Sequence, residues 1–93
     1  MEFCQSIRSI ESIYDDVREG RITFGPHLIQ RMWESGISIN QVLDTILTGT
    51  VNKQEKDEHS QGKFAKYTIS KGKLVIVVKD CQPAFVITAN RRP

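Results

Sequence analysis

Residues 63–89 read KFAKYTISKGKLVIVVKDCQPAFVITA, and this stretch decides the fold. Its first eight residues alternate between two faces, the period-two pattern of a strand, with Tyr67 and Ile69 on the apolar face. A tight hairpin turn is predicted at Lys71-Gly72. The run LVIVV after this turn has no polar face and predicts a central strand, and residues 84–89 predict the last strand. The stretch therefore predicts a meander of antiparallel strands.

The residues before this stretch have the period of helices. Near the N-terminus apolar side chains recur every three or four residues, which predicts an amphipathic helix ending at Glu19-Gly20. These apolar side chains are Phe3, Ile7, Ile10, Tyr14 and Val17. A short link over residues 21–24 leads to a second helix, which we expect to begin at Gly25-Pro26 and to end at Ser35-Gly36.

A third helix is predicted after Ser38, whose side chain and that of Gln41 have the spacing of a capping box, and it ends at Gly49. Its apolar stripe consists of Ile39, Val42, Leu43, Ile46 and Leu47. Residues 51–58 then predict a polar edge strand. This order predicts an α+β fold in which N-terminal helices pack on one face of a three- to four-stranded antiparallel sheet.

Length and composition indicate one ordinary globular domain. The chain has 93 residues, of which 39% are hydrophobic and 26% charged. No apolar run approaches the roughly 20 residues that span a bilayer, and no signal segment is recognisable, so we expect a cytoplasmic protein without a membrane partner. Cys4 and Cys81 lack any paired spacing, which favours two thiols over a disulfide.

The charge is distributed unevenly along the chain. Residues 1–50 carry four arginines against seven acidic residues, a net charge of −3, whereas residues 51–93 carry nine basic residues against four acidic ones, a net charge of +5. A basic half is typical of phosphate binding. Lysines also discourage aggregation at the edges of sheets, and the sequence leaves both explanations open.

The predicted second helix places a proton-transfer group and a permanent cation together. His27, Arg31 and Glu34 fall within an arc of roughly 60°, and Leu28, Ile29, Met32 and Trp33 fall on the other side. Two interpretations remain for the polar side: it is solvated, or it lines a cleft over another element. Glu34 either orients the imidazole or, as the favoured interpretation, pairs with Arg31.

These residues also carry a family resemblance. The run His27-Leu-Ile-Gln-Arg31, then Gly36-Ile37-Ser38, a helix ending at Thr48-Gly49, the strand with Lys66-Tyr67 and the closing Val86-Ile87-Thr88 resemble an uncharacterised family of small domains grouped with the RelE/ParE and BrnT-like toxins. The resemblance covers about residues 21–90. It implies a RelE/ParE-like toxin domain over residues 21–93, preceded by a helical extension over residues 1–20.

The resemblance implies a function as well as a fold. Relatives of this wider group include metal-independent ribonucleases that cut messenger or transfer RNA, and some members act on DNA gyrase instead. It therefore implies RNA as a partner, in some cases on the ribosome, and a cognate antitoxin protein that restrains the activity. It implies no cofactor.

Metal-independent RNA cleavage needs proton-transfer groups and cations near the phosphate. The candidate catalytic residues are His27, Arg31, Lys66 and Thr88, and the candidate RNA-binding residues are Lys53, Tyr67 and Arg91. An imidazole exchanges protons near neutral pH, and a guanidinium offers a fixed fork of donors to phosphate oxygens. The ordinary alternatives are a solvated Lys66, a Tyr67 packed in the core and a Thr88 that is simply a strand former.

Other classes of site find less support in the sequence. His27, His59, Cys4 and Cys81 are of ligand type but lack paired spacing, so no metal site is predicted. The alternative function is a non-catalytic module of the same fold that binds an antitoxin or another protein through the N-terminal helix. That helix either completes the core or forms a homodimer contact.

Overall fold

The computed structural model describes the backbone of residues 2–56, 64–81 and 83–92, with side chains described from Ile10 onward. The elements are α1 (Glu2–Arg18), β1 (Thr23–Phe24), α2 (Pro26–Ser35), α3 (Ile39–Thr48), β2 (Thr50–Lys56), β3 (Ala65–Lys71), β4 (Leu74–Lys79) and β5 (Phe85–Arg91). The predicted turn at residues 58–62, with His59, lies outside the described residues. No helix in the described part is long and apolar enough to cross a membrane.

The sheet has five strands and is mixed, in the order β1-β5-β4-β3-β2. Strands β2 to β5 form the predicted antiparallel meander, but the expected count of three or four strands was too low. The missed strand is β1, which lies within the segment expected to be a link and pairs in parallel with β5. The Thr23 backbone N–H donates to the Ala84 carbonyl at 2.8 Å. Two residues are too short to show a strand period in a sequence.

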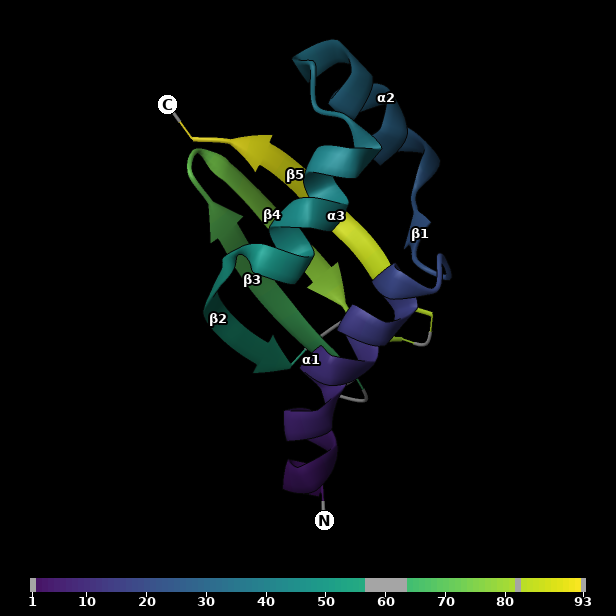
Figure 1. Ribbon diagram of the computed structural model, residues 1–93, viewed down its shortest axis with the longest axis vertical. Coiled ribbons are helices and arrows are strands. Elements are labelled where there is room, and N and C mark those ends of the chain that lie inside the picture. Colours follow the sequence, from purple (N-terminus) through teal and green to yellow (C-terminus); the bar gives the residue numbers. More distant parts are fainter. Residues whose placement is uncertain (1, 57–63, 82, 93) are drawn as a thin grey trace.

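All three helices lie on one face of the sheet (Figure 1), so the predicted α+β layering is confirmed. The cross-strand register aligns the core residues of the sheet in rows, with Tyr67 opposite Val78 and Val78 opposite Val86. These three side chains are buried beneath the helices together with Ile69, Ile76 and Ala89.

Helix α1 contributes to this core. Ile13 is fully buried and Val17 is nearly so, whereas Tyr14 is half-buried. The predicted stripe was therefore wrong in omitting Ile13, because the helix is rotated so that Ile13 and Val17 face the sheet. The side chains of Phe3 and Ile7 lie outside the described residues. For its described part, the helix completes the core.

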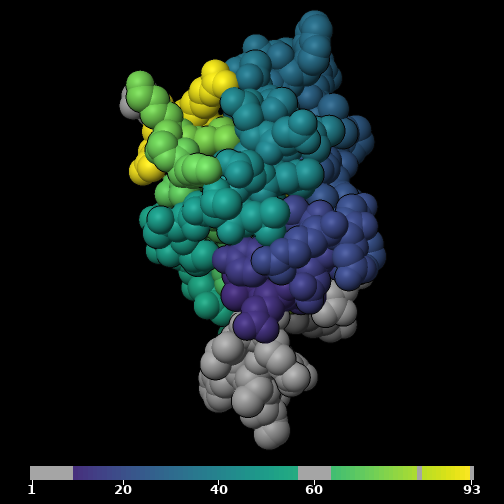
Figure 2. Space-filling view, in the orientation of Figure 1, coloured from purple at the N-terminus to yellow at the C-terminus, as the bar shows by residue number. Residues whose placement is uncertain are grey.

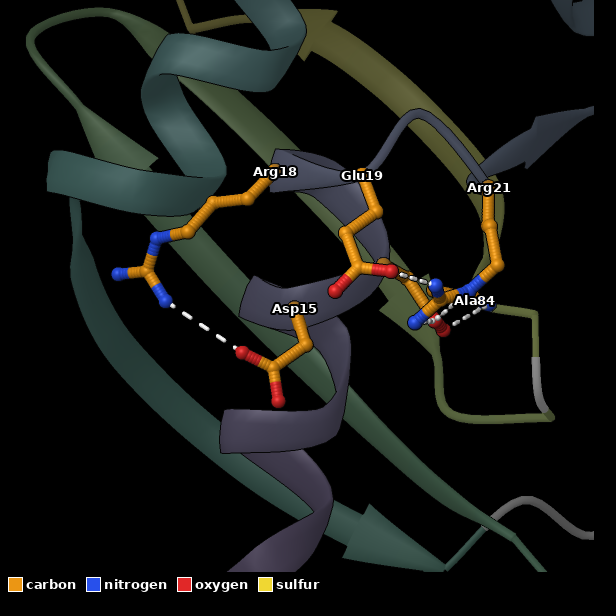
Figure 3. Close-up of polar contacts among 6 residues, drawn as sticks. Asp15, Arg18, Glu19, Arg21 and Ala84 are labelled. Atoms are coloured by element: carbon orange, nitrogen blue, oxygen red, sulfur yellow. Dashed lines mark hydrogen bonds and ion pairs between the residues drawn. The ribbon is translucent and has the colours of Figure 1, made fainter.

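A buried carboxylate fastens the end of α1 to the sheet. Asp16 accepts hydrogen bonds from Arg21 Nε at 3.1 Å and from the Ala84 backbone N–H at 2.8 Å, and Arg21 Nη2 lies 2.9 Å from it. Arg21 also pairs with Glu19, as Figure 3 shows. These contacts raise the pKa of Arg21, with the hydrogen bond to Glu19 as the largest cause and that to Asp16 next. The link between α1 and β1 is thereby held against the start of β5.

The predicted ends of α2 and α3 are confirmed. Gly36 ends α2 with φ 70°, a left-handed conformation that favours glycine. Ser38 Oγ accepts from the Gln41 backbone N–H at 3.1 Å, and Gln41 Oε1 accepts from the Ser38 N–H at 2.8 Å, which completes the capping box. A Cβ on Gly49 would lie 2.5 Å from the Thr45 carbonyl oxygen, so only glycine fits between α3 and β2.

The apolar face of α2 differs from the prediction. Leu28 and Met32 are buried, but Ile29 is 45% exposed and Trp33 is 83% exposed. The helix lies at the margin of the sheet, and only its side nearest the core is covered. Ile29 and Trp33, one turn apart, therefore form an exposed apolar ridge.

Candidate functional site

A cavity of about 520 Å³ lies between α2 and β5. His27, Arg31 and Glu34 line it from the helix, and Ile87, Thr88 and Asn90 line it from the strand. Its position follows from the shortness of β1, which pairs with β5 only at Phe85 and Val86. Beyond Val86 the chain has turned at Gly25-Pro26 into α2, so the helix lies beside the rest of β5.

The polar side of α2 therefore borders a cavity, as the second of the two predicted interpretations requires. His27 and Arg31 are exposed and Thr88 is half-buried. In the described part of the chain Arg31 does not form the expected ion pair with Glu34, which accepts a hydrogen bond from Gln30 Nε2 at 3.4 Å. Within the described residues no carboxylate pairs with Arg31, so its guanidinium is available to an anionic ligand.

A bulge in β5 determines where Thr88 lies. Val78 pairs with Val86 and Val77 pairs with Thr88, which leaves Ile87 as an extra residue. In an uninterrupted strand Thr88 and Val86 would share a face, and the bulge places them on opposite faces. Because it pairs with Val77, Thr88 belongs to the face of the sheet that the helices do not cover. It also lines the cavity. The cavity and the uncovered face of the sheet meet at this residue.

Lys66 and Lys53 do not belong to this cavity. Lys66 lies on β3, two strands away from β5, which corresponds to about 10 Å. Both lysines pair with Glu55, with Nζ to oxygen distances of 3.1 Å for Lys53 and 3.3 Å for Lys66. Hydrogen bonds from Lys53 and then from Lys66 lower the pKa of Glu55. The two lysines thus form a separate charged cluster near the opposite edge of the sheet.

Tyr67 and Arg91, two of the predicted RNA-binding residues, do not line this cavity. Tyr67 is 1% exposed, so its ring is part of the core and cannot stack on a base. Its hydroxyl accepts a hydrogen bond from Gln54 Nε2 at 3.4 Å. Arg91 donates from Nη2 to the Gly36 carbonyl at 3.0 Å, at the end of α2. Arg91 lines a second cavity of about 310 Å³ instead.

The second cavity holds basic residues that were not predicted as site residues from the sequence. Lys71 and Lys73 line it together with Arg91. The sequence shows these cations as a Lys-Gly-Lys turn and a separate basic pair, Arg91-Arg92. That they lie together follows only from the register of β4 against β5, which pairs Leu74 with Arg91. Within the described part of the chain, no three histidine, cysteine, aspartate or glutamate side chains are close enough to hold a metal ion.

Comparison with known proteins identifies a family but no characterised relative. No curated protein and no solved structure matches the chain. A family model described as a domain of unknown function, DUF4258, matches residues 24–91. This range contains both sides of the cavity between α2 and β5 and begins after α1. The chain belongs to the DUF4258 family.

Proposed function

We propose that the protein binds single-stranded RNA in the cavity between α2 and β5 and cleaves it without a metal ion, and that a cognate antitoxin restrains this activity. The observation that carries the proposal is that His27, Arg31 and Thr88 line one cavity although Thr88 is far from the other two in sequence. The resemblance of the same residues to RelE/ParE-like toxins supports it, as does the layering of three helices on one face of the sheet (Figure 1).

The cavity offers groups for each requirement of the cleavage step. The His27 imidazole accepts the proton of the 2′-hydroxyl, whose oxygen then attacks phosphorus. The bond from phosphorus to the 2′-oxygen forms as the bond to the 5′-oxygen breaks, and water in this open cavity protonates the leaving 5′-oxygen. Arg31 and the Thr88 hydroxyl donate to the phosphate oxygens on which negative charge develops. The products are a 2′,3′-cyclic phosphate and a 5′-hydroxyl.

The decisive experiment incubates the purified full chain with end-labelled single-stranded RNA, with and without EDTA. We expect fragments that end in 2′,3′-cyclic phosphate in both conditions, and an RNA affinity that falls as salt rises. Intact RNA together with no salt-dependent affinity would overturn the proposal. Growth arrest on expression without a partner gene is the cellular counterpart of this result.

Arg31→Ala tests the phosphate contact separately from the chemistry. We expect weaker RNA binding and a slower reaction, with the slope of log affinity against log salt reduced by about 0.7 because one phosphate contact is lost. Arg18→Ala is the matched control, since Arg18 is an exposed arginine on α1 that pairs with Asp15 at 3.6 Å. Equal effects of the two substitutions would show that net charge, and not the cavity, governs binding.

The exposed ridge of Ile29 and Trp33 favours a protein-binding module as the second candidate function, with α2 as the binding surface in place of the N-terminal helix predicted from the sequence. Tryptophan is enriched among the residues that dominate protein interfaces. Helical rotation places the ridge on the opposite side of α2 from His27 and Arg31. A protein partner can therefore occupy the ridge without entering the cavity.

Trp33 is the single tryptophan of the chain, so its fluorescence distinguishes the two candidate functions. In the isolated protein we expect the emission of a water-exposed indole, because the side chain is 83% exposed. RNA in the cavity should leave the emission wavelength unchanged, whereas a protein on the ridge should shift it to the blue. A blue shift on addition of RNA alone would show that RNA covers this face of α2.

A further inference from the structure

Four basic side chains gather at one end of the sheet. Lys71 and Lys73 flank Gly72 in the turn between β3 and β4. Beside them Arg91 ends β5 and Arg92 follows it. In Figure 2 the green residues of this hairpin and the yellow C-terminal residues lie side by side at one corner of the molecule. We refer to Lys71, Lys73, Arg91 and Arg92 as the basic corner.

The backbone builds this arrangement. Gly72 takes a φ of 62° at the hairpin turn, which brings Lys71 and Lys73 to either side of it. The Arg92 backbone N–H donates to the Lys73 carbonyl at 2.7 Å, and Arg92 Nη2 donates to the Gly72 carbonyl at 3.1 Å. One hydrogen bond from its backbone and one from its guanidinium thus hold Arg92 against the turn.

The charge of the basic corner is only partly balanced. Lys71 Nζ lies 2.7 Å from Asp44 Oδ2 and donates to Thr48 Oγ1 at 2.8 Å. Within the described residues Asp44 is the single carboxylate paired with any of the four cations, which leaves a local charge of +3. All four basic residues are exposed. Like charges held together in this way repel one another, and a polyanion relieves the repulsion.

Protection of a sheet edge does not account for the basic corner. Lysines that discourage aggregation are spread along an edge strand, and the far edge of this sheet is β2. The basic corner instead combines a hairpin turn with the end of β5, the strand beside which α2 lies. Two of its members are arginines, which bind phosphate oxygens with a planar fork of donors.

The basic corner lies next to the cavity between α2 and β5 along the same strand. Asn90 lines that cavity, and the next residue, Arg91, lines the cavity at the basic corner, on the other face of β5. Arg91 comes three positions after Thr88, which corresponds to about 10 Å along β5. A strand of a few nucleotides spans this separation.

We infer that the basic corner is a phosphate-binding site for the part of a single-stranded RNA that flanks the segment bound in the cavity. This inference rests on the proposed function and extends it to the length of the substrate. The corner contacts phosphates and not bases, so it increases affinity without sequence preference. RNA long enough to reach both places binds more tightly than a short oligonucleotide that fills the cavity alone.

The test compares two RNA lengths and two pairs of substitutions. Lys73→Gln with Arg92→Gln removes two charges from the basic corner and spares Lys71 and Arg91, which contact α3 and the end of α2. The control pair, Lys56→Gln with Arg18→Gln, makes the same change of net charge at exposed positions on β2 and α1. Affinities for RNA of about 4 and about 12 nucleotides, lengths within the range of single-strand sites, are measured over a series of salt concentrations.

For the basic-corner variant we expect a loss of about tenfold in affinity for the longer RNA and a salt slope lower by about 1.4, since two phosphate contacts disappear. Affinity for the shorter RNA should be unchanged, the control pair should resemble the wild type, and a DNA oligonucleotide of the longer length should show the same loss. If the wild type binds both RNAs but the basic-corner variant equals the control, this inference fails and the proposed function stands. If the wild type binds neither RNA, both fail.

Discussion

Replacing Asp16 by alanine is expected to lower the free energy of unfolding by about 2–3 kcal/mol. The carboxylate is 5% exposed and receives hydrogen bonds from the Arg21 guanidinium and the Ala84 backbone N–H. Its removal leaves that buried N–H of Ala84 without a partner. Arg21 is half-exposed, so water can hydrate its guanidinium in the variant. We therefore expect a smaller loss of stability than from breaking a fully buried ion pair.

The preceding residue provides the control. Asp15 has the same side chain on the same helix, but it pairs with Arg18 at 3.6 Å and both side chains are more than half exposed. We expect Asp15→Ala to cost about 0.5 kcal/mol or less. Urea unfolding followed by circular dichroism measures both variants. Equal midpoints would mean that α1 is not fastened to the sheet through Asp16.

The effect of Asp16→Ala also tests whether α1 belongs to the same folding unit as the sheet. The family model begins at Phe24, and residues 1–20 are an extension according to the resemblance. In the structure, however, Ile13 and Val17 belong to the same core as the strands. A large effect of Asp16→Ala would show that α1 contributes to the stability of the part that contains the cavity.

Features that depend on neighbouring residues were predictable from the sequence. The ends of α2 and α3 follow from Gly36 and from the pair Ser38 and Gln41, because helix capping is decided within one turn. The antiparallel meander followed from the apolar run of β4 between two turn segments. The burial of Leu28 and Met32 followed from the helical period.

Features that depend on distant residues were not predictable. Strand β1 exists because Ala84 presents its carbonyl to Thr23, and nothing in the two residues of β1 reveals this. The bulge at Ile87 reverses the parity of every residue after it. The exposure of Trp33 reflects the position of α2 at the margin of the sheet, which is a property of packing.

The same distinction between neighbouring and distant residues applies to the candidate site. His27 and Arg31 are one turn apart, so their common face could be read from the spacing. Their proximity to Thr88, and the separation of Lys66 from all three, depend on the order of the strands. The strand order also brings Lys73 and Arg92 together, and this explains why the basic corner was not predicted from the sequence.

The last prediction concerns the imidazole on which the proposed chemistry depends. We expect His27→Ala to slow RNA cleavage by roughly 10² or more, which is the contribution of a positioned proton-transfer group. RNA affinity should change little, since Arg31 and the basic corner supply the phosphate contacts. The side chain is exposed on the polar face of α2, so the free energy of unfolding should change by under about 1 kcal/mol.

Gln30→Ala is the matched comparison for this prediction, because Gln30 lies on the same helix and lines the same cavity but cannot transfer a proton. We expect its cleavage rate to remain within about tenfold of the wild type, since no proton-transfer step is lost. Single-turnover rates at saturating RNA separate the chemical step from binding. If His27→Ala cleaves as fast as Gln30→Ala while both bind RNA normally, the cavity binds RNA without cleaving it through His27. The combination of a slow His27→Ala variant and an unchanged affinity is the result that only proton transfer at this position explains.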